Sequence, residues 1–303
     1  TYINNVIEFS DSTKTSRGLI VYKPSRVEIR GSRFNNCIYN EHGCGFALNP
    51  ICSAETNGIE NVIIEDTIFD RCYSAQSVND KQSAIYLCIN HVITFNNVII
   101  QNSNPTSNCN IIIFETPRNV FIEEQKIYDC TFINCSTQYE QDHKGGIGFK
   151  HDNIRNLIFE LCNFNNLRTT GFGGAVAFHD LRSNADDYSI EFQNCKFDNN
   201  SVTGNDGKGA SLYFNVSYSV TVSSCNFTFQ SLNGYGGAVY AESSSNVFIE
   251  NSGFYSTVTS GGRGNAIYLA RGLPIATIAN NNKFVDCGTS KTGSVIESEA
   301  KEF

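Results

Sequence analysis

The sequence predicts an all-β chain folded as a right-handed parallel β-helix, a solenoid of about ten coils of roughly 31 residues. Three observations lead to this fold class. Two short motifs recur along the chain, the aromatic residue of one motif returns every 27 to 35 residues, and no segment has the apolar spacing of an amphipathic helix. We expect residues 1–303 to form a single such solenoid. Because the chain has no Met, even at position 1, we expect it to be a portion of a longer protein.

The first motif is an alternating strand that leads into a phenylalanine and a polar turn, as in "SIEFQNCKFDNN" (189–200) and "SVTVSSCNFTFQ" (219–230). In a solenoid, equivalent positions of successive coils lie above one another, so these phenylalanines are predicted to form one stacked inward column. Ile99, in the weak copy "NNVIIQNS", takes the aromatic place. The members of the column are Phe34, Phe69, Phe132, Phe164, Phe197, Phe227, Phe254 and Phe284.

The second motif is a glycine corner followed by a short apolar strand, as in "KGGIGFKHD" (144–152), "FGGAVAFHD" (172–180) and "YGGAVYAES" (235–243). Glycine suits a sharp corner because a positive φ is costly for other residues. Leucine-rich repeats would show a regular Leu spacing, and a propeller blade needs about 40 residues or more. Neither is present, so each period is predicted to be one coil of two or three short parallel strands.

Two further columns follow from the stacking. Cysteine lies two residues before the aromatic in four successive coils, and because side chains alternate across a strand, cysteine and phenylalanine share the inward face. We therefore expect Cys130, Cys162, Cys195 and Cys225 to be buried, unbridged thiols. Asparagine lies two residues after the aromatic, where stacked amides can hydrogen-bond along the axis, at Asn36, Asn134, Asn166 and Asn199.

The pairing of Gly-Gly-Ala-Val (173–176 and 236–239) with Phe-Asp-Asn-Asn (197–200) resembles the repeats of the polymorphic outer membrane proteins. Degenerate copies of both motifs cover nearly the whole chain. The resemblance implies a β-helical adhesin-like rod that is secreted or lies on the cell surface. The chain departs from that family in having Cys in the place of Asn in several coils, such as Cys37 and Cys135, and we expect no membrane-anchoring β-barrel domain within residues 1–303.

Composition excludes several function classes. The net charge is −8 and the 22 Lys and Arg residues are scattered, so nucleic acid is not an expected partner. No run of about 18 apolar residues is present to span a membrane. No Cys-x-x-Cys motif supports a zinc site, and we expect no cofactor and no bound metal.

The cysteines and the glycosylation sequons bear on whether the protein is secreted into an oxidising compartment. The chain has 12 cysteines, of which Cys44, Cys52, Cys88 and Cys109 lie near predicted turns. An oxidising compartment would permit a bridge such as Cys44 to Cys52, although the sequence does not fix the connectivity. Four Asn-x-Ser/Thr sequons are glycosylation candidates in a secreted protein: Asn134, Asn199, Asn215 and Asn226.

An enzymatic alternative rests on one polar cluster. His151-Asp152 and His179-Asp180 follow the second glycine of consecutive coils by five and six residues, so their side chains are candidates to stack. Paired carboxylates about 5–5.5 Å apart act in retaining glycosidases, and two histidines with two carboxylates suit a divalent metal. The pectate-lyase-like solenoid is also the fold of many polysaccharide-cleaving enzymes. However, the motifs of pectin-cleaving hydrolases are missing, and neighbouring copies carry Glu242 or Phe214 at the equivalent place, as expected of a tolerant surface position.

Three functions remain, in order of preference. The first is an extracellular or cell-surface rod that binds a cell-surface protein or glycan, as adhesins do. The second is a structural subunit that self-associates end to end, because the terminal stretches resemble unfinished coils. The third is a polysaccharide hydrolase or lyase with His151, Asp152, His179 and Asp180 as its site.

Overall fold

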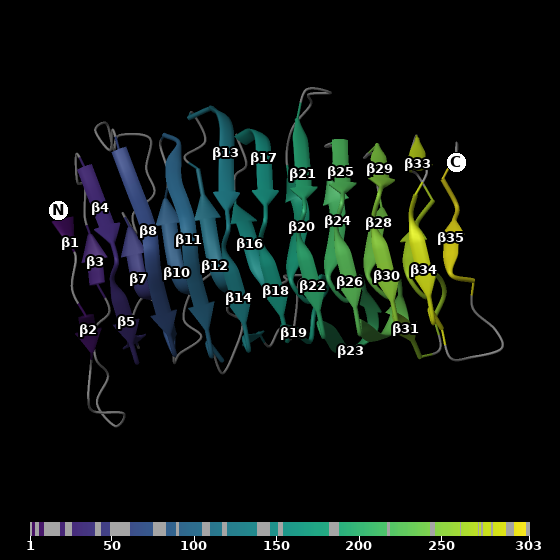
Figure 1. The fold of residues 1–303 in the computed structure, drawn as a ribbon, viewed down its shortest axis with the longest axis horizontal. Coiled ribbons are helices and arrows are strands. Elements are labelled where there is room, and N and C mark those ends of the chain that lie inside the picture. Colours follow the sequence, from purple (N-terminus) through teal and green to yellow (C-terminus); the bar gives the residue numbers. More distant parts are fainter. Residues whose placement is uncertain are drawn as a thin grey trace.

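A computed structural model places every part of the chain that it describes in one β-solenoid. The described residues are 2–3, 6–8, 19–21, 26–39, 44–48, 61–74, 83–88, 91–104, 110–116, 120–137, 146–150, 154–181, 188–216, 219–242, 246–260, 262–271, 273, 275–279, 281–288 and 294–300. Strands stack in chain order along the long axis, from the N-terminal strands to the C-terminal ones (Figure 1). All paired strands are parallel, and the described residues contain no helix. The predicted all-β parallel solenoid is therefore confirmed.

The first side of the solenoid carries the alternating strands. The two long strands β8 and β11 run on into the second side, so the strands of both sides join into one 18-stranded sheet. In chain order the strands of the first side are β1 (Tyr2–Ile3), β4 (Arg26–Arg30), β8 (Asn61–Asp70), β11 (Ile93–Gln101), β13 (Ile122–Tyr128), β17 (Ile154–Glu160), β21 (Ser189–Gln193), β25 (Ser219–Ser223), β29 (Val247–Glu250) and β33 (Ala276–Ile278).

The second side carries the phenylalanine column. Besides the ends of β8 and β11, its strands are three residues long, and wherever the side chains are described the middle residue points inward. They are β2 (Val6–Glu8), β5 (Arg33–Asn35), β14 (Thr131–Ile133), β18 (Asn163–Asn165), β22 (Lys196–Asp198), β26 (Asn226–Thr228), β30 (Gly253–Tyr255) and β34 (Lys283–Val285).

The remaining strands close the coil. A ten-stranded sheet consists of β3 (Leu19–Val21), β7 (Cys44–Leu48), β10 (Ser83–Cys88), β12 (Asn110–Glu115), β16 (Ile147–Lys150), β20 (Val176–Leu181), β24 (Leu212–Val216), β28 (Val239–Glu242), β32 (Ile267–Leu269) and β35 (Ile296–Ser298). Between it and the second side lie two smaller sheets. The five-stranded sheet consists of β15 (Ser136–Thr137), β19 (Arg168–Thr169), β23 (Ser201–Lys208), β27 (Ser231–Tyr235) and β31 (Val258–Thr259). The two-stranded sheet consists of β6 (Ile38–Tyr39) and β9 (Tyr73–Ser74). Coils that carry a strand on every side are therefore fewer than the ten expected, among the described residues.

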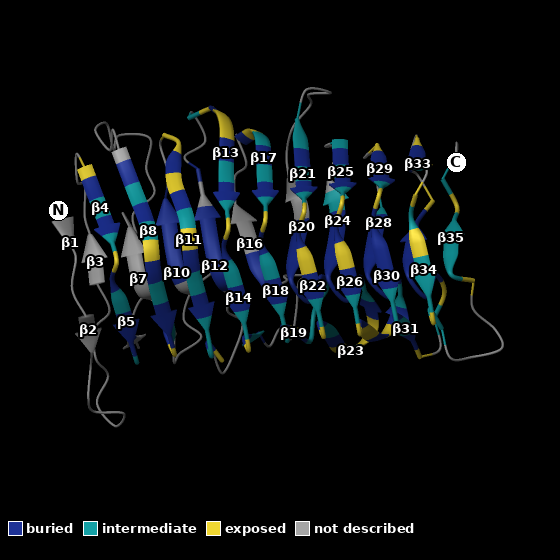
Figure 2. Cartoon of the chain, viewed as in Figure 1, coloured by how far each residue is buried: buried dark blue, intermediate teal, exposed yellow. Residues whose placement is uncertain are grey.

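The predicted phenylalanine column is confirmed. Members in neighbouring coils are register partners, and the rings of Phe164, Phe197 and Phe227 stack nearly parallel with centroids 4.7 and 4.6 Å apart. All but the last member, Phe284, are fully buried (Figure 2). One assignment was wrong: Ile100, not Ile99, pairs with Phe69 and Phe132 and fills the aromatic place. Motif counting missed this because Val98, Ile99 and Ile100 are three consecutive apolar residues, so without a phenylalanine nothing in the sequence marks which of them points inward.

Each coil turns at residues with positive φ. Two columns of such residues lie five positions apart and enclose the three-residue strand of the second side, as Asn194 and Asn199 do for β22. Asn and Asp are common there because their short polar side chains tolerate the left-handed conformation. The predicted glycine corner is also confirmed: Gly236 has φ 68°, and a Cβ on it would lie 2.3 Å from the carbonyl oxygen of Val239.

Candidate functional site

The four residues of the predicted enzymatic cluster are only partly covered by the structure. His151 and Asp152 lie outside the described residues. His179 and Asp180 lie on β20, and their side chains are also outside the description. The backbone of His179 pairs with Asn215, and the register shifts between His179 and Leu181. The catalytic and metal-binding alternatives at these residues therefore remain hypotheses.

The backbone register corrects how those positions were aligned. Ile147 pairs with Val176, which places Gly146 opposite Ala175 rather than opposite Gly174. Counting an equal number of residues from the second glycine therefore misaligns these two coils by one residue. The same correction applies in the next coil, where Asn215 and not Phe214 is the partner of His179.

A polar cluster that the sequence did not reveal lies on the outer surface of the ten-stranded sheet. Its centre is Glu242 on β28, at the column position that Asn215 occupies in the preceding coil. The Lys208 ammonium, from the end of β23, donates to both carboxylate oxygens at 3.0 and 2.9 Å. Two tyrosine hydroxyls donate as well, Tyr213 to Oε1 at 2.5 Å and Tyr240 to Oε2 at 2.9 Å. Glu242 is therefore not at a tolerant surface position, since its side chain is only 21% exposed and accepts four hydrogen bonds.

Aromatic rings surround the cation of this cluster. The Lys208 ammonium lies 5.0 Å from the ring centroid of Phe172 and 4.9 Å from that of Tyr240, within the range of cation–π attraction. The rings of Tyr213, Tyr240 and Tyr268 stack along the axis, with centroids 5.7 and 5.3 Å apart. These contacts place the cation, whose side chain is 23% exposed, among aromatic rings while leaving it paired with its carboxylate.

The protonation states in the cluster follow from these contacts. Burial raises the pKa of Glu242, but the hydrogen bonds from Tyr213 and Lys208 outweigh burial and hold the pKa below its ordinary value. Burial, followed by the hydrogen bond to Glu242, raises the pKa of Tyr213 well above that of free tyrosine. Because its lone pairs already accept from Lys208 and two tyrosines, Glu242 is poorly placed to take a proton from a substrate. The arrangement suits a latch that fastens the end of β23 onto the ten-stranded sheet.

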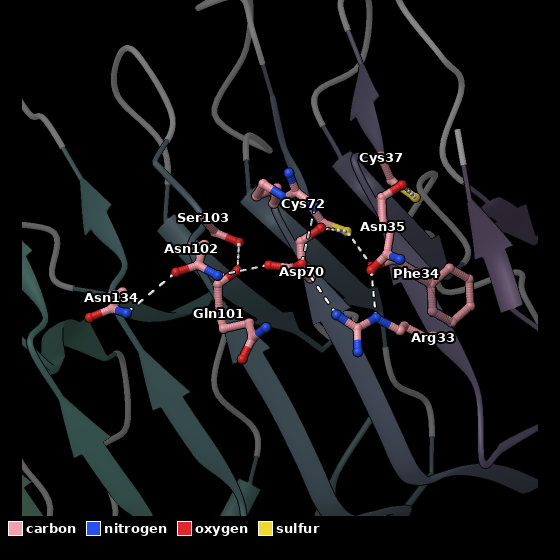
Figure 3. Close-up of polar contacts among 11 residues, drawn as sticks. Arg33, Phe34, Asn35, Cys37, Asp70, Cys72, Gln101, Asn102, Ser103 and Asn134 are labelled. Carbon is pink, nitrogen blue, oxygen red and sulfur yellow. Dashed lines mark hydrogen bonds and ion pairs between the residues drawn. The ribbon is translucent and has the colours of Figure 1, made fainter. Parts of the chain in front are cut away.

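A second network surrounds Asp70 at the end of β8 (Figure 3). Its carboxylate is 7% exposed and pairs with the guanidinium groups of Arg33 and Arg71 at 3.5 and 3.4 Å. Its other oxygen accepts from the amide of Asn102 at 2.8 Å. Asn134 in turn donates to Asn102 at 3.4 Å, so the network joins the asparagine column. All these partners stabilise the charge of Asp70 within the fold.

The predicted asparagine column forms an amide ladder. Asn166 donates to Asn134 at 2.8 Å, and Asn199 donates to Asn166 at 3.3 Å. Two of the four sequons, at Asn134 and Asn199, therefore lie in the ladder. The other two, at Asn215 and Asn226, lie on strands β24 and β26.

The predicted cysteine column is confirmed. Cys130, Cys162, Cys195 and Cys225 are buried free thiols that donate weakly to backbone carbonyls, Cys195 for example to that of Phe159 at 3.4 Å. Burial raises the pKa values of Cys130, Cys162 and Cys195 and raises that of Cys135 to about 12, so these thiols are unreactive in the folded chain.

Among the described side chains, one cysteine takes part in a disulfide. Cys88 is disulfide-bonded, and its partner is not among the side chains that the structure describes. The example bridge from Cys44 to Cys52 also lies outside the described side chains.

Within the described residues, no group of three or more His, Cys, Asp and Glu side chains is placed to hold a metal ion. The described part of the chain also contains no helix that is long and apolar enough to cross a membrane. No family model, curated protein or solved structure matches the chain, so the resemblance to polymorphic outer membrane proteins has no support from a family match.

Proposed function

We propose that the protein is a rod that acts outside the cell or on its surface and binds a cell-surface protein or glycan through its outer faces. One observation carries the proposal: the inward positions of the coil repeat the same side chains, whereas the outward positions vary from coil to coil. On the second side the inward residue is phenylalanine in eight coils. The outward register partners in the same strands include Asn165, Asp198, Thr228 and Tyr255.

This contrast supports binding rather than a role limited to stacking. A solenoid needs repeated interior residues to fill its core, and nothing in the packing requires the exterior to vary. A specific partner recognises a rigid surface on which the side chains differ from one position to the next. The disulfide at Cys88 supports an oxidising compartment, since disulfides persist mainly in secreted and surface proteins.

Binding to arrays of cell-surface glycans and to intact cells tests the proposal. We expect saturable binding of the purified rod, reduced by outward substitutions such as Asp198→Ala with Asn165→Ala and retained in a matched pair on another side, Glu191→Ala with Thr221→Ala. These residues face outward on β18, β22, β21 and β25. The absence of saturable binding would contradict the proposal.

The same preparation tests the two alternatives. Turnover of an acidic or neutral polysaccharide that is abolished by Asp152→Asn or Asp180→Asn would make the protein an enzyme. Concentration-dependent filaments in sedimentation, without cell binding, would favour the end-to-end structural role.

A further inference from the structure

Among the four sequons, Asn226 on β26 differs in its surroundings. Asn134 and Asn199 lie at positive-φ corners and donate their amide groups along the ladder. Asn215 is half-buried, and its side chain is hydrogen-bonded to Tyr213 within the Glu242 cluster. Asn226 is exposed on a regular strand, and its side-chain amide has no hydrogen-bond partner among the described residues. Its nitrogen is therefore available without breaking a contact of the fold.

The next coil places an aromatic ring beside this amide. The register partner of Asn226 is Gly253, which has no side chain. The point where a Cβ of Gly253 would lie is 2.8 Å from Asn226 Oδ1 and 2.4 Å from Cε2 of Tyr255. The Tyr255 ring thus lies across the glycine and against the Asn226 amide.

A second aromatic residue lies close by without a covering contact. Phe229 follows β26 at the corner, is 61% exposed and has φ 53°. Its backbone N–H donates to the carbonyl of Tyr255 at 3.0 Å, so the two aromatic residues are neighbours across coils. Among the described residues no ring or cation contacts Phe229. A bulky residue with left-handed backbone costs free energy, and because its ring is exposed, no burial of the ring offsets that cost.

We propose that Asn226 carries an N-linked glycan whose sugars pack over Tyr255 and Phe229. This inference rests on the proposed extracellular location, which supplies the glycosylation pathway. In the transfer, the Asn226 amide nitrogen forms a bond to the anomeric carbon of a lipid-linked oligosaccharide. The bond from that carbon to the lipid pyrophosphate breaks, and the amide loses one proton. Thr228, two residues on, completes the acceptor sequon.

The glycan would account for the exposed ring of Phe229, and it would also contact the half-buried ring of Tyr255, over which the Lys283 ammonium lies at 5.8 Å from the centroid. Sugar rings present C–H groups on their faces, and these groups pack on aromatic rings as other apolar surfaces do. Covering Phe229 and Tyr255 would remove apolar area from water and stabilise the folded coil. A glycan at Asn134 or Asn199 would instead interfere with amides that the ladder uses.

The test compares secreted proteins from one eukaryotic cell line, so that the disulfide at Cys88 forms in every sample. Glycopeptide mass spectrometry is expected to show the Asn226 site occupied. Two variants lack the glycan for different reasons: Asn226→Gln removes the acceptor, and Thr228→Val keeps Asn226 but removes the sequon. We expect both to melt below the wild type by about 2 °C or more. In a Tyr255→Ala, Phe229→Ala background, the shift caused by Asn226→Gln should fall to less than half.

Two results would overturn the inference. One is an unoccupied Asn226 in the secreted protein, and the other is a glycan-dependent melting shift that is unchanged without the two aromatic rings. Either result leaves the cell-binding assay of the proposed function untouched. Conversely, an occupied rod that binds no cell or glycan would contradict the proposed function alone.

Discussion

The loss in free energy of unfolding when one phenylalanine ring of the column is removed should depend on whether that ring has stacked neighbours on both sides or on one. Phe197 is fully buried, and its ring stacks on Phe164 and on Phe227 at 4.7 and 4.6 Å. It also meets the edge of Phe192 at 5.8 Å. Removing such a ring typically costs about 3–5 kcal/mol, because apolar burial is lost and a cavity remains that the neighbours cannot close. We expect Phe197→Ala to lie in the upper part of this range, since the rings above and below are held by their own strands.

Phe284 provides the matched control. It ends the column, is half-buried, and among the described rings stacks on that of Phe254 alone, at 4.9 Å. Phe284→Ala should therefore cost about half as much, and Phe197→Leu should recover most of the loss because it refills the cavity. Urea unfolding followed by circular dichroism and by tyrosine fluorescence measures the differences, provided that the two probes give coincident transitions. Equal costs for Phe197→Ala and Phe284→Ala would refute the reasoning from stacking.

Three further predictions concern the corner, the thiols and the latch. Gly236→Ala should lower the free energy of unfolding by about 1–3 kcal/mol, because it places a Cβ at a positive-φ corner against the Val239 carbonyl. Urea unfolding measures this loss, and an unchanged free energy would refute the clash. Burial raises the pKa of the Cys195 thiol, so its contribution to stability is present below the unfolded pKa of about 8.5 and is lost as pH rises above it. A Cys195→Ala variant should therefore lose less stability between pH 8 and 10 than the wild type, and native Cys195 should resist iodoacetamide. Glu242→Gln should cost about 1–3 kcal/mol because it leaves the Lys208 ammonium against aromatic rings without a counter-charge. Since the pKa of Glu242 is lowered by folding, the wild type should also lose stability as pH falls through that pKa, and the variant should not.

The sequence allowed the interior to be predicted because interior chemistry repeats. A period of about 30 residues and the alternation of side chains across a strand were enough to place Phe197 and Cys195 on the same inward face. The glycine corner was also predictable, since a positive φ has few solutions other than Gly, Asn and Asp.

The exterior could not be predicted in the same way. Coil lengths differ, so counting from a motif gives the wrong partner where a residue is added or lost, as at Gly146. The bonds from Lys208 to Glu242 join residues 34 positions apart, and they depend on the reach of both side chains across neighbouring coils. No local pattern in the sequence signals such a contact, whereas the register of the strands does.

The corners show where this chain departs from its own rule. In the column that follows the short strands, five of nine left-handed residues are asparagine, and a sixth is aspartate: Asn36, Arg71, Asn102, Asn134, Asn166, Asn199, Phe229, Ser256 and Asp286. Asparagine both tolerates the conformation and extends the amide ladder, so it is favoured for two physical reasons. Phe229 provides neither and exposes a ring to water. Departures from a consistent local pattern concentrate at functional or strained positions. A ligand bound over the surface formed by Asn226, Phe229 and Tyr255 would explain why an exposed phenylalanine stands at this corner.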